Sequence, residues 1–191
     1  MKKLVILISN AGTGTNLKAI IDGIESGKIN AGEQVIVLPE NMEIKINTVE
    51  KFLENAASAS AGESIGITSD DFNFERGQVM AVKNALPKVT KTFRANVFWM
   101  SPNALKKDEK IILKIATQEV QCKIERIEKR INSSSLELLE ENAGYLEDTE
   151  VGQVVVSAEK PVVIESFNEV EELGRFVLVK DMDISGGGII I

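Results

Sequence analysis

The 191-residue chain contains no histidine and a single cysteine, Cys122. The absence of histidine excludes Ser-His-Asp and Cys-His nucleophile arrangements and the usual zinc sites. It also removes the side chain that most often serves as a general acid or base near neutral pH. A lone cysteine excludes an intramolecular disulfide and any cysteine-rich metal site. We therefore single out no catalytic residue and no metal site, and we expect Cys122 to be a small buried side chain in a strand.

Basic charge and long apolar runs are also scarce. The net charge is −7 and the pI is about 4.9, which argues against nucleic acid or an anionic membrane as the main partner, because binding phosphates requires a basic surface. No apolar segment is long enough to span a membrane. The apolar run at residues 4–8 is too short for a secretory signal and lacks a small-residue cleavage site. We therefore expect a cytoplasmic protein.

The pattern of residue types in the first thirty residues differs from that in the rest of the chain. The apolar run at residues 4–8 predicts a strand buried on both faces. A loop of glycine, threonine and asparagine follows, and residues 17–24 then place apolar side chains at helical spacing, with Thr15 or Asn16 as a possible cap. A strand, a glycine-containing loop and a helix can hold a phosphate at the helix N-terminus. The candidate phosphate-binding residues are Gly12, Thr13, Gly14, Thr15 and Asn16. Two glycines are a weak signal, and an ordinary connecting turn is the competing interpretation.

From Gly32 onward the pattern is that of β-structure. Residues 43–47 alternate strictly, with Ile44 and Ile46 on the buried face. Short strands separated by turns then recur along the chain, as in a barrel. Residues 84–88 look like a linker, and in the long strand that follows Phe93, Val97 and Trp99 share one face.

Residues 119–131 are ambiguous. Val120, Ile124, Ile127 and Ile131 fit a helix, and the local pattern slightly favours one. Val120, Cys122 and Ile124 fit a strand, with a slip in phase before Ile127 that a β-bulge would produce.

Three further segments have simpler patterns. We expect a short helical turn at residues 136–142, whose acidic side chains form a solvated face rather than a metal site. A turn is expected at Glu159-Lys160, between strands at residues 151–157 and 161–164. Gly186, Gly187 and Gly188 are expected to form a close-packed turn into a last strand.

Several of these stretches match one known family. They are GIESGKI at residues 23–29, AGESIGI at 61–67, ERGQ at 75–78, FRANVFWM at 93–100, KIAT at 114–117 and GRFVLV at 174–179. From about Gly23 to its end the chain resembles the two C-terminal β-barrel domains of the GTP-dependent large subunit of sulfate adenylyltransferase, a relative of elongation factor Tu. This resemblance implies a strand at residues 119–131. It also implies a first barrel at residues 32–86 and a second at residues 87–191.

In that family a GTPase domain precedes the barrels. The phosphate-loop pattern G-x-x-x-x-G-K-[ST] does not occur in this sequence, and phosphoryl transfer depends on that loop, its lysine and magnesium. We therefore expect these residues not to hydrolyse GTP.

Residues 1–31 resemble a different family. Leu7-Ile8-Ser9 and residues 12–21 are similar to the opening of phosphoribosylglycinamide formyltransferase, in which the glycine loop cradles the substrate phosphate. The catalytic asparagine, histidine and aspartate of that family lie in a part of its domain that has no counterpart here. The resemblance therefore implies phosphate binding at most, without formyl transfer.

Together these patterns predict a mainly β protein with two consecutive small β-barrels of translation-factor type. The segment at residues 4–8 is expected to pair into the first barrel, because a missing strand would leave open edges. For residues 17–24 local propensity favours helix and barrel closure favours strand, and both remain open.

The leading functional expectation is a non-catalytic docking or scaffold module without a cofactor. By resemblance it would bind the small subunit of sulfate adenylyltransferase or a GTPase domain. The alternatives are a phosphate-binding remnant of the formyltransferase and an acidic interaction protein unrelated to sulfate.

Overall fold

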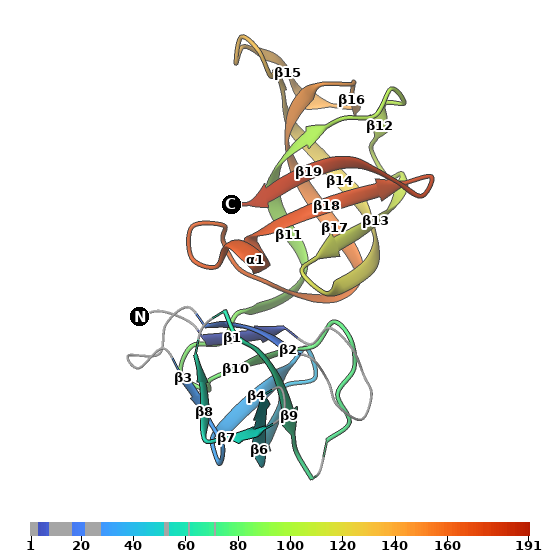
Figure 1. Cartoon of the computed structure of the whole chain (residues 1–191). Coiled ribbons are helices and arrows are strands. Elements are labelled where there is room, and N and C mark those ends of the chain that lie inside the picture. The colour runs from blue at the N-terminus through green and yellow to red at the C-terminus, as the bar shows by residue number, and fades with distance from the viewer. Residues whose placement is uncertain (1–3, 8–16, 22–27, 52–53, 61, 71) are drawn as a thin grey trace. The chain divides into compact units, whose positions relative to one another are not determined.

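The computed structural model describes residues 4–7, 17–21, 28–51, 54–60, 62–70 and 72–191. The chain divides into two compact units, Met1–Val89 and Thr90–Ile191 (Figure 1). Both are built of β-strands, and within the described residues the one helix is the single turn α1, Glu171–Gly174. The expectation of a mainly β protein is therefore confirmed.

The described residues of the first unit form ten short strands. They are β1 (Leu4–Leu7), β2 (Leu17–Ile21), β3 (Lys28–Asn30), β4 (Gln34–Leu38), β5 (Met42–Lys45), β6 (Thr48–Lys51), β7 (Glu54–Ala56), β8 (Ser58–Ser60), β9 (Ser64–Thr68) and β10 (Val79–Ala81). Eight of them form a sheet in the order β5-β4-β10-β1-β2-β9-β6-β7, and β3 pairs with β8. Ile44 and Ile46 are buried in the core of this unit, as their alternation predicts.

Strands β1 and β2 fill the middle of that sheet. β1 pairs antiparallel with β10 on one side and with β2 on the other, and β2 pairs with β9. The prediction that the first apolar run joins the first barrel is confirmed for Leu4–Leu7. The strand alternative holds for Leu17–Ile21 and the helical one is wrong there, because a helix would leave the edges of β1 and β9 without hydrogen-bond partners.

The second unit contains the longer strands. They are β11 (Lys88–Trp99), β12 (Leu105–Lys106), β13 (Lys110–Ile115), β14 (Gln118–Asn132), β15 (Leu138–Ala143), β16 (Tyr145–Leu146), β17 (Glu150–Ile164), β18 (Arg175–Lys180) and β19 (Asp183–Ile190). Seven of them form a sheet in the order β13-β18-β19-β11-β17-β14-β15, and β12 pairs with β16. A further pairing between β13 and β14 closes the sheet into a barrel.

Strand β14 resolves the ambiguous segment. Its pairing register with β17 shifts between Ile124 and Arg126 and again between Ile127 and Lys129. Such shifts insert extra residues and let both Ile124 and Ile127 point into the core. The strand and the bulge are confirmed, and the helical spacing is the product of these irregularities. Cys122 is also buried in this core, and burial raises the pKa of its thiol to about 12.

Three local expectations were wrong. A strand, β15, begins at Leu138 where a helical turn was expected, because these residues pair with β14. The expected turn at Glu159-Lys160 lies within the continuous strand β17. The β14 ladder on β17 ends at Ala158, so Pro161 removes no hydrogen bond from that ladder.

The third correction concerns Gly186 to Gly188, which lie inside β19 rather than in a turn. At two of these positions a side chain larger than that of glycine would clash with an aromatic side chain that packs against the strand. A Cβ atom at Gly186 would lie 2.9 Å from Cε3 of the fully buried Trp99. A Cβ atom at Gly188 would overlap the ring of Phe176, which makes an edge contact with Phe93. In the core of the second unit, the side chains of Trp99 and Phe176 thus pack directly against the glycine backbone of β19.

This packing makes a matched pair of predictions. Gly188→Ala should destabilise the protein by about 1–3 kcal/mol, because the new methyl group forces the Phe176 ring or the Asn96 carbonyl to move. Gly187→Ala is the control, since its new Cβ would meet no atom closer than 3.9 Å. Urea unfolding of both variants measures the difference. A Gly188→Ala protein as stable as the Gly187→Ala protein would contradict this account of the core.

Candidate functional site

The residues predicted to bind phosphate, Gly12 to Asn16, lie outside the described residues. In the described part of the chain no three His, Cys, Asp or Glu side chains are placed to hold a metal ion. No helix among the described residues is long and apolar enough to cross a membrane. The most distinctive feature of the described surface is instead an apolar area on the second barrel.

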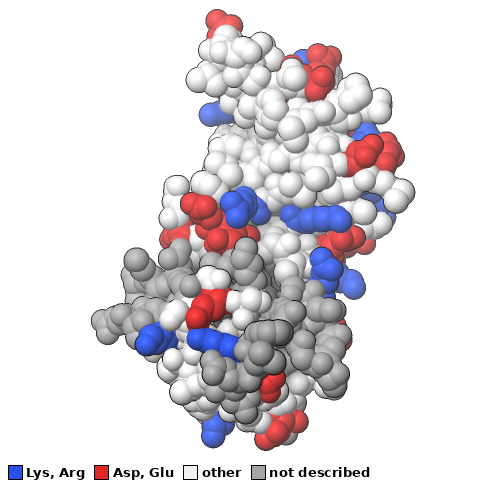
Figure 2. Space-filling model, viewed as in Figure 1, with Lys and Arg blue, Asp and Glu red and all other residues white. Residues whose placement is uncertain are grey.

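This area lies on the outer face of strands β11, β19 and β18. Along β11 the buried side chains alternate with outward ones, so Val97 and Trp99 enter the core while Phe98 and Met100 face outward. Figure 2 shows that the surface over β18 and β19 is largely free of charged atoms. We call this area the apolar sheet face. Its members are Phe98, Met100, Val177, Ile184, Gly187 and Ile189, which are exposed or half-buried.

The register of the strands brings these residues together from distant parts of the chain. Gly187 pairs with Phe98 on one side and with Val177 on the other. Because Gly187 has no side chain and the space above it is open, it leaves a shallow depression between the two apolar neighbours. Ile184 pairs with Val179 and is 63% exposed. A side chain of a partner could therefore contact several apolar groups at once.

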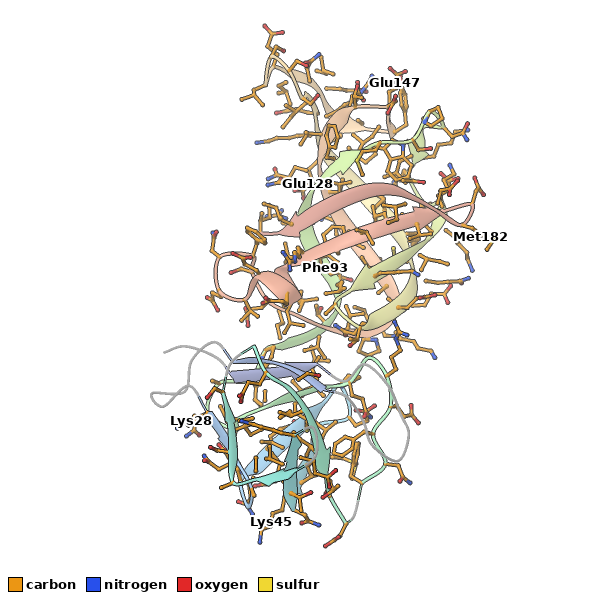
Figure 3. The ribbon with its side chains drawn as sticks, in the orientation of Figure 1. Lys28, Lys45, Phe93, Glu128, Glu147 and Met182 are labelled. Carbon is orange, nitrogen blue, oxygen red and sulfur yellow. The ribbon has the colours of Figure 1, made fainter. Side chains whose placement is uncertain are left out.

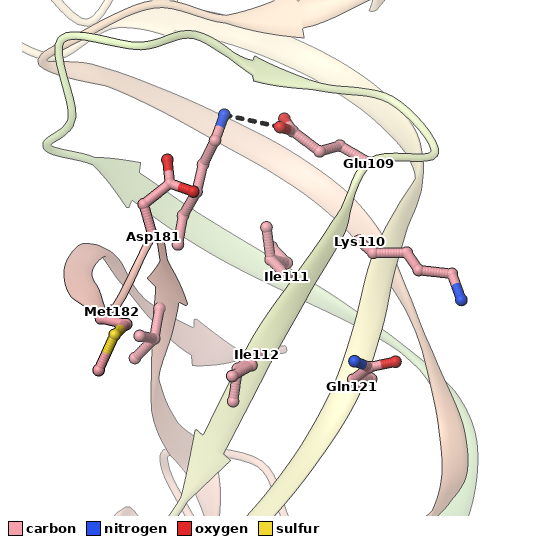
Figure 4. A pocket seen from close by; sticks show the side chains of 9 residues that line it. Glu109, Lys110, Ile111, Ile112, Gln121, Asp181 and Met182 are labelled. Atoms are coloured by element: carbon pink, nitrogen blue, oxygen red, sulfur yellow. Dashed lines mark ion pairs between the residues drawn. The ribbon is translucent and has the colours of Figure 1, made fainter.

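A hollow of about 230 Å³ adjoins this face (Figure 4). Val179 and Ile112 line it, and Met182 stands beside it at the tip of the β18–β19 hairpin (Figure 3). Met182 is 96% exposed and has a φ of 69°, the left-handed turn geometry that holds the side chain away from the barrel. An exposed methionine next to an apolar hollow is typical of adaptable protein-binding surfaces.

An ion pair closes the polar side of the hollow. Lys180 Nζ lies 2.7 Å from Glu109 Oε1, as the dashed line in Figure 4 marks. Burial raises the pKa of Glu109, but its hydrogen bonds with Lys180 and the Lys106 amide lower that pKa overall. The carboxylate is therefore charged and already neutralised at neutral pH.

A second polar centre lies where β14 leaves the barrel. Arg130 forms two hydrogen bonds with Glu150, from Nε at 2.7 Å and from Nη2 at 2.9 Å. Its guanidinium also lies over the Tyr145 ring, 4.7 Å from the centroid. The hydrogen bond from Arg130 lowers the pKa of Glu150. Both side chains are largely buried, so this pair fixes the geometry of the local strands.

The sequence contained part of the signal for the apolar sheet face. Placing Phe93, Val97 and Trp99 on one face of a strand leaves Phe98 and Met100 on the other. The sequence did not show which strands would flank β11, so the contributions of Val177, Ile184 and Gly187 were missed.

The architecture defines the class of protein: consecutive β-barrels of the translation-factor type. A crystal structure of sup35 complexed with GDP matches with a TM-score of 0.87 over 99% of this chain and 47% of that chain, at 16% identity. At this identity the likeness concerns the fold alone. Residues 92–191 match the family of GTP-eEF1A C-terminal domain-like proteins. The chain belongs to this family.

Two curated relatives show how far the likeness extends. Elongation factor 1-alpha of Natronomonas pharaonis is 33% identical over 93% of this chain and 42% of that protein. Sulfate adenylyltransferase subunit 1 of Tolumonas auensis is 27% identical over 88% of this chain and 36% of that protein. The chain thus spans less than half the length of either relative. The expected resemblance is confirmed for the shared barrel domains, and the elongation factor has the higher identity of the two.

The buried ion pair yields a pH-dependent prediction. Because the pKa of Glu150 is lowered in the folded protein, its carboxylate stabilises the fold at pH values above its pKa in the unfolded chain, about 4.3. This stabilisation is lost as the pH falls through the pKa of the folded state. Glu150→Gln should cost about 1–3 kcal/mol at pH 7 and progressively less toward pH 3. Denaturant unfolding at both pH values measures the gap.

Glu141→Gln is the matched control, since Glu141 is an exposed carboxylate on the neighbouring strand β15. It should leave stability unchanged at both pH values. An equal loss for Glu150→Gln at pH 7 and pH 3 would show that the carboxylate charge contributes nothing.

Proposed function

We propose that this chain is a non-catalytic docking module that binds a partner protein through the apolar sheet face. The proposed partner is the small subunit of sulfate adenylyltransferase, with a GTPase domain as the alternative occupant. In either case the barrels supply a rigid binding surface and the partner supplies the chemistry.

One observation carries the proposal. Phe98, Met100 and Ile184 expose apolar side chains on rigid, paired strands, with a shallow depression at Gly187 and a hollow beside them. Contiguous exposed apolar area of this kind marks interaction sites, because leaving it in water forgoes about 25 cal/mol per Å² of stabilisation. Strand positions also need little reorganisation on binding, which lowers the entropic cost of association.

The relatives support the choice of partner. The protein of Tolumonas auensis is by its name one subunit of sulfate adenylyltransferase, so a barrel module of this kind is found in an enzyme with more than one subunit. The match to a family named for GTP and eEF1A supports the alternative occupant. The lack of histidine and the neutralised Lys180–Glu109 pair support a role without catalysis.

A binding experiment with a matched pair of variants tests this proposal. Purified chain is mixed with the small subunit, and separately with a GTPase domain of the sulfate-activating family, and each mixture is analysed by size-exclusion chromatography with light scattering. We expect a stable complex with the small subunit. Met100→Ser should weaken it by about tenfold, because truncating an interface side chain removes buried apolar contact.

Met42→Ser is the control. Met42 and Met100 are both 46% exposed, but Met42 lies on β5 of the first unit, so its truncation should leave binding unchanged. A complex with the GTPase domain alone would shift the proposal to the alternative occupant. Separate peaks in both mixtures, or equal binding by the two serine variants, would overturn the proposed use of the apolar sheet face.

A further inference from the structure

Strand β15 is the open edge of the sheet in the second unit. β13 pairs with β14 as far as Lys123, and β15 pairs with β14 farther along, from Ile127 to Ile131. In the part of the chain that the structure describes, β15 has no partner besides β14. We call residues 133–149 the arm; the turn and the strand β15 that begin it extend from the end of the closed barrel (Figure 1), and Ala143 and Leu146 join the core.

The arm offers the groups that an added strand needs. In an antiparallel pair every second residue directs its N–H and C=O away from its partner strand, so β15 presents backbone donors and acceptors on its open side. The arm also exposes large apolar side chains: Leu136 at 77%, Leu138 at 51% and Leu139 at 46%. An edge strand with exposed leucines is a template for pairing with another chain.

The charges of the arm select the partner. The arm contains no lysine or arginine, and its five acidic residues are Glu137, Glu140, Glu141, Glu147 and Asp148. The cation nearest to two of them is Arg130, whose closest contacts are to Glu150 at 2.7 and 2.9 Å. Glu140 and Glu147 lie farther from Arg130, at 3.4 Å, and are about half exposed. One guanidinium thus serves three carboxylates, and negative charge remains in excess.

We propose that β15 binds an extended segment of a partner protein that carries lysine or arginine together with apolar residues on each face, because Leu138 and Glu141 share one face of β15. The segment adds as a new strand at the open edge, its apolar side chains contact the leucines, and its cations pair with the surplus carboxylates. A second copy of this chain would bring like charges together at the same edge, and nucleic acid would be repelled by them. This surface is separate from the apolar sheet face, and the proposal stands independently of the partner proposed there.

A model peptide tests the proposal. The probe is a fluorescent peptide of ~10 residues, the length of a long strand, in which pairs of lysine alternate with pairs of valine, so that each face of the strand carries both residue types. Fluorescence anisotropy with the full chain should show saturable one-to-one binding that weakens between about 50 and 300 mM salt. Hydrogen exchange should slow at every second amide of β15 when the peptide binds. The same peptide with glutamate in place of lysine should not bind.

Charge-reversal variants localise the binding. Glu137→Lys with Glu141→Lys should weaken the lysine–valine peptide at least tenfold. Glu40→Lys with Glu75→Lys is the matched control, because both residues are exposed in the first unit and the change in net charge is the same. Equal binding by the two double variants would overturn the proposal, as would equal binding of the glutamate peptide. Self-association of the wild-type chain through β15, seen by sedimentation, would overturn it as well.

Discussion

Closure of the second barrel by β14 is the constraint on which its other features depend. The first half of β14 pairs with β13 and completes the ring of strands, while β17 runs along its other side. The two register shifts let one long strand follow the curved wall and still place Cys122, Ile124 and Ile127 in the core. Beyond the barrel β14 continues and pairs with β15, which creates the arm. Closure also fixes β11, β19 and β18 as neighbours, and their outer side becomes the apolar sheet face.

Strand pairing also determines the structure of the first unit. The slot between β10 and β9 has to be filled by two strands, and residues 4–7 and 17–21 fill it. The apolar run of the first segment predicted its strand directly. The second segment has helical spacing, and the sequence could not decide its structure because the deciding hydrogen bonds come from β1 and β9. In residues 119–131 local spacing slightly favoured the wrong structure for the same reason, and the family resemblance decided in favour of the strand that Val120, Cys122 and Ile124 also fit.

Parts of the proposed binding surfaces were predictable and parts were not. Alternation along β11 showed that Phe98 and Met100 lie opposite Trp99, but the neighbours of Phe98 come from almost ninety residues farther along the chain. Three consecutive glycines suggested a turn, whereas Gly186 and Gly188 are small because Trp99 and Phe176 pack against them. The acidity of residues 136–142 was visible as a solvated surface. That these acidic residues lie at an open sheet edge, where we propose that they bind a cationic segment, can be recognised only from the tertiary structure.

Amide hydrogen exchange of the free chain, resolved by residue with NMR, tests most directly whether β14 closes the barrel and leaves β15 open. The account predicts that the amides of Cys122 and Lys123 exchange only through global unfolding, since these two residues pair with β13 on one side and with β17 on the other. Along β15 exchange should alternate, with every second amide as fast as an exposed loop. Rapid exchange at Cys122 and Lys123, or uniform protection along β15, would contradict the closed barrel with one open edge.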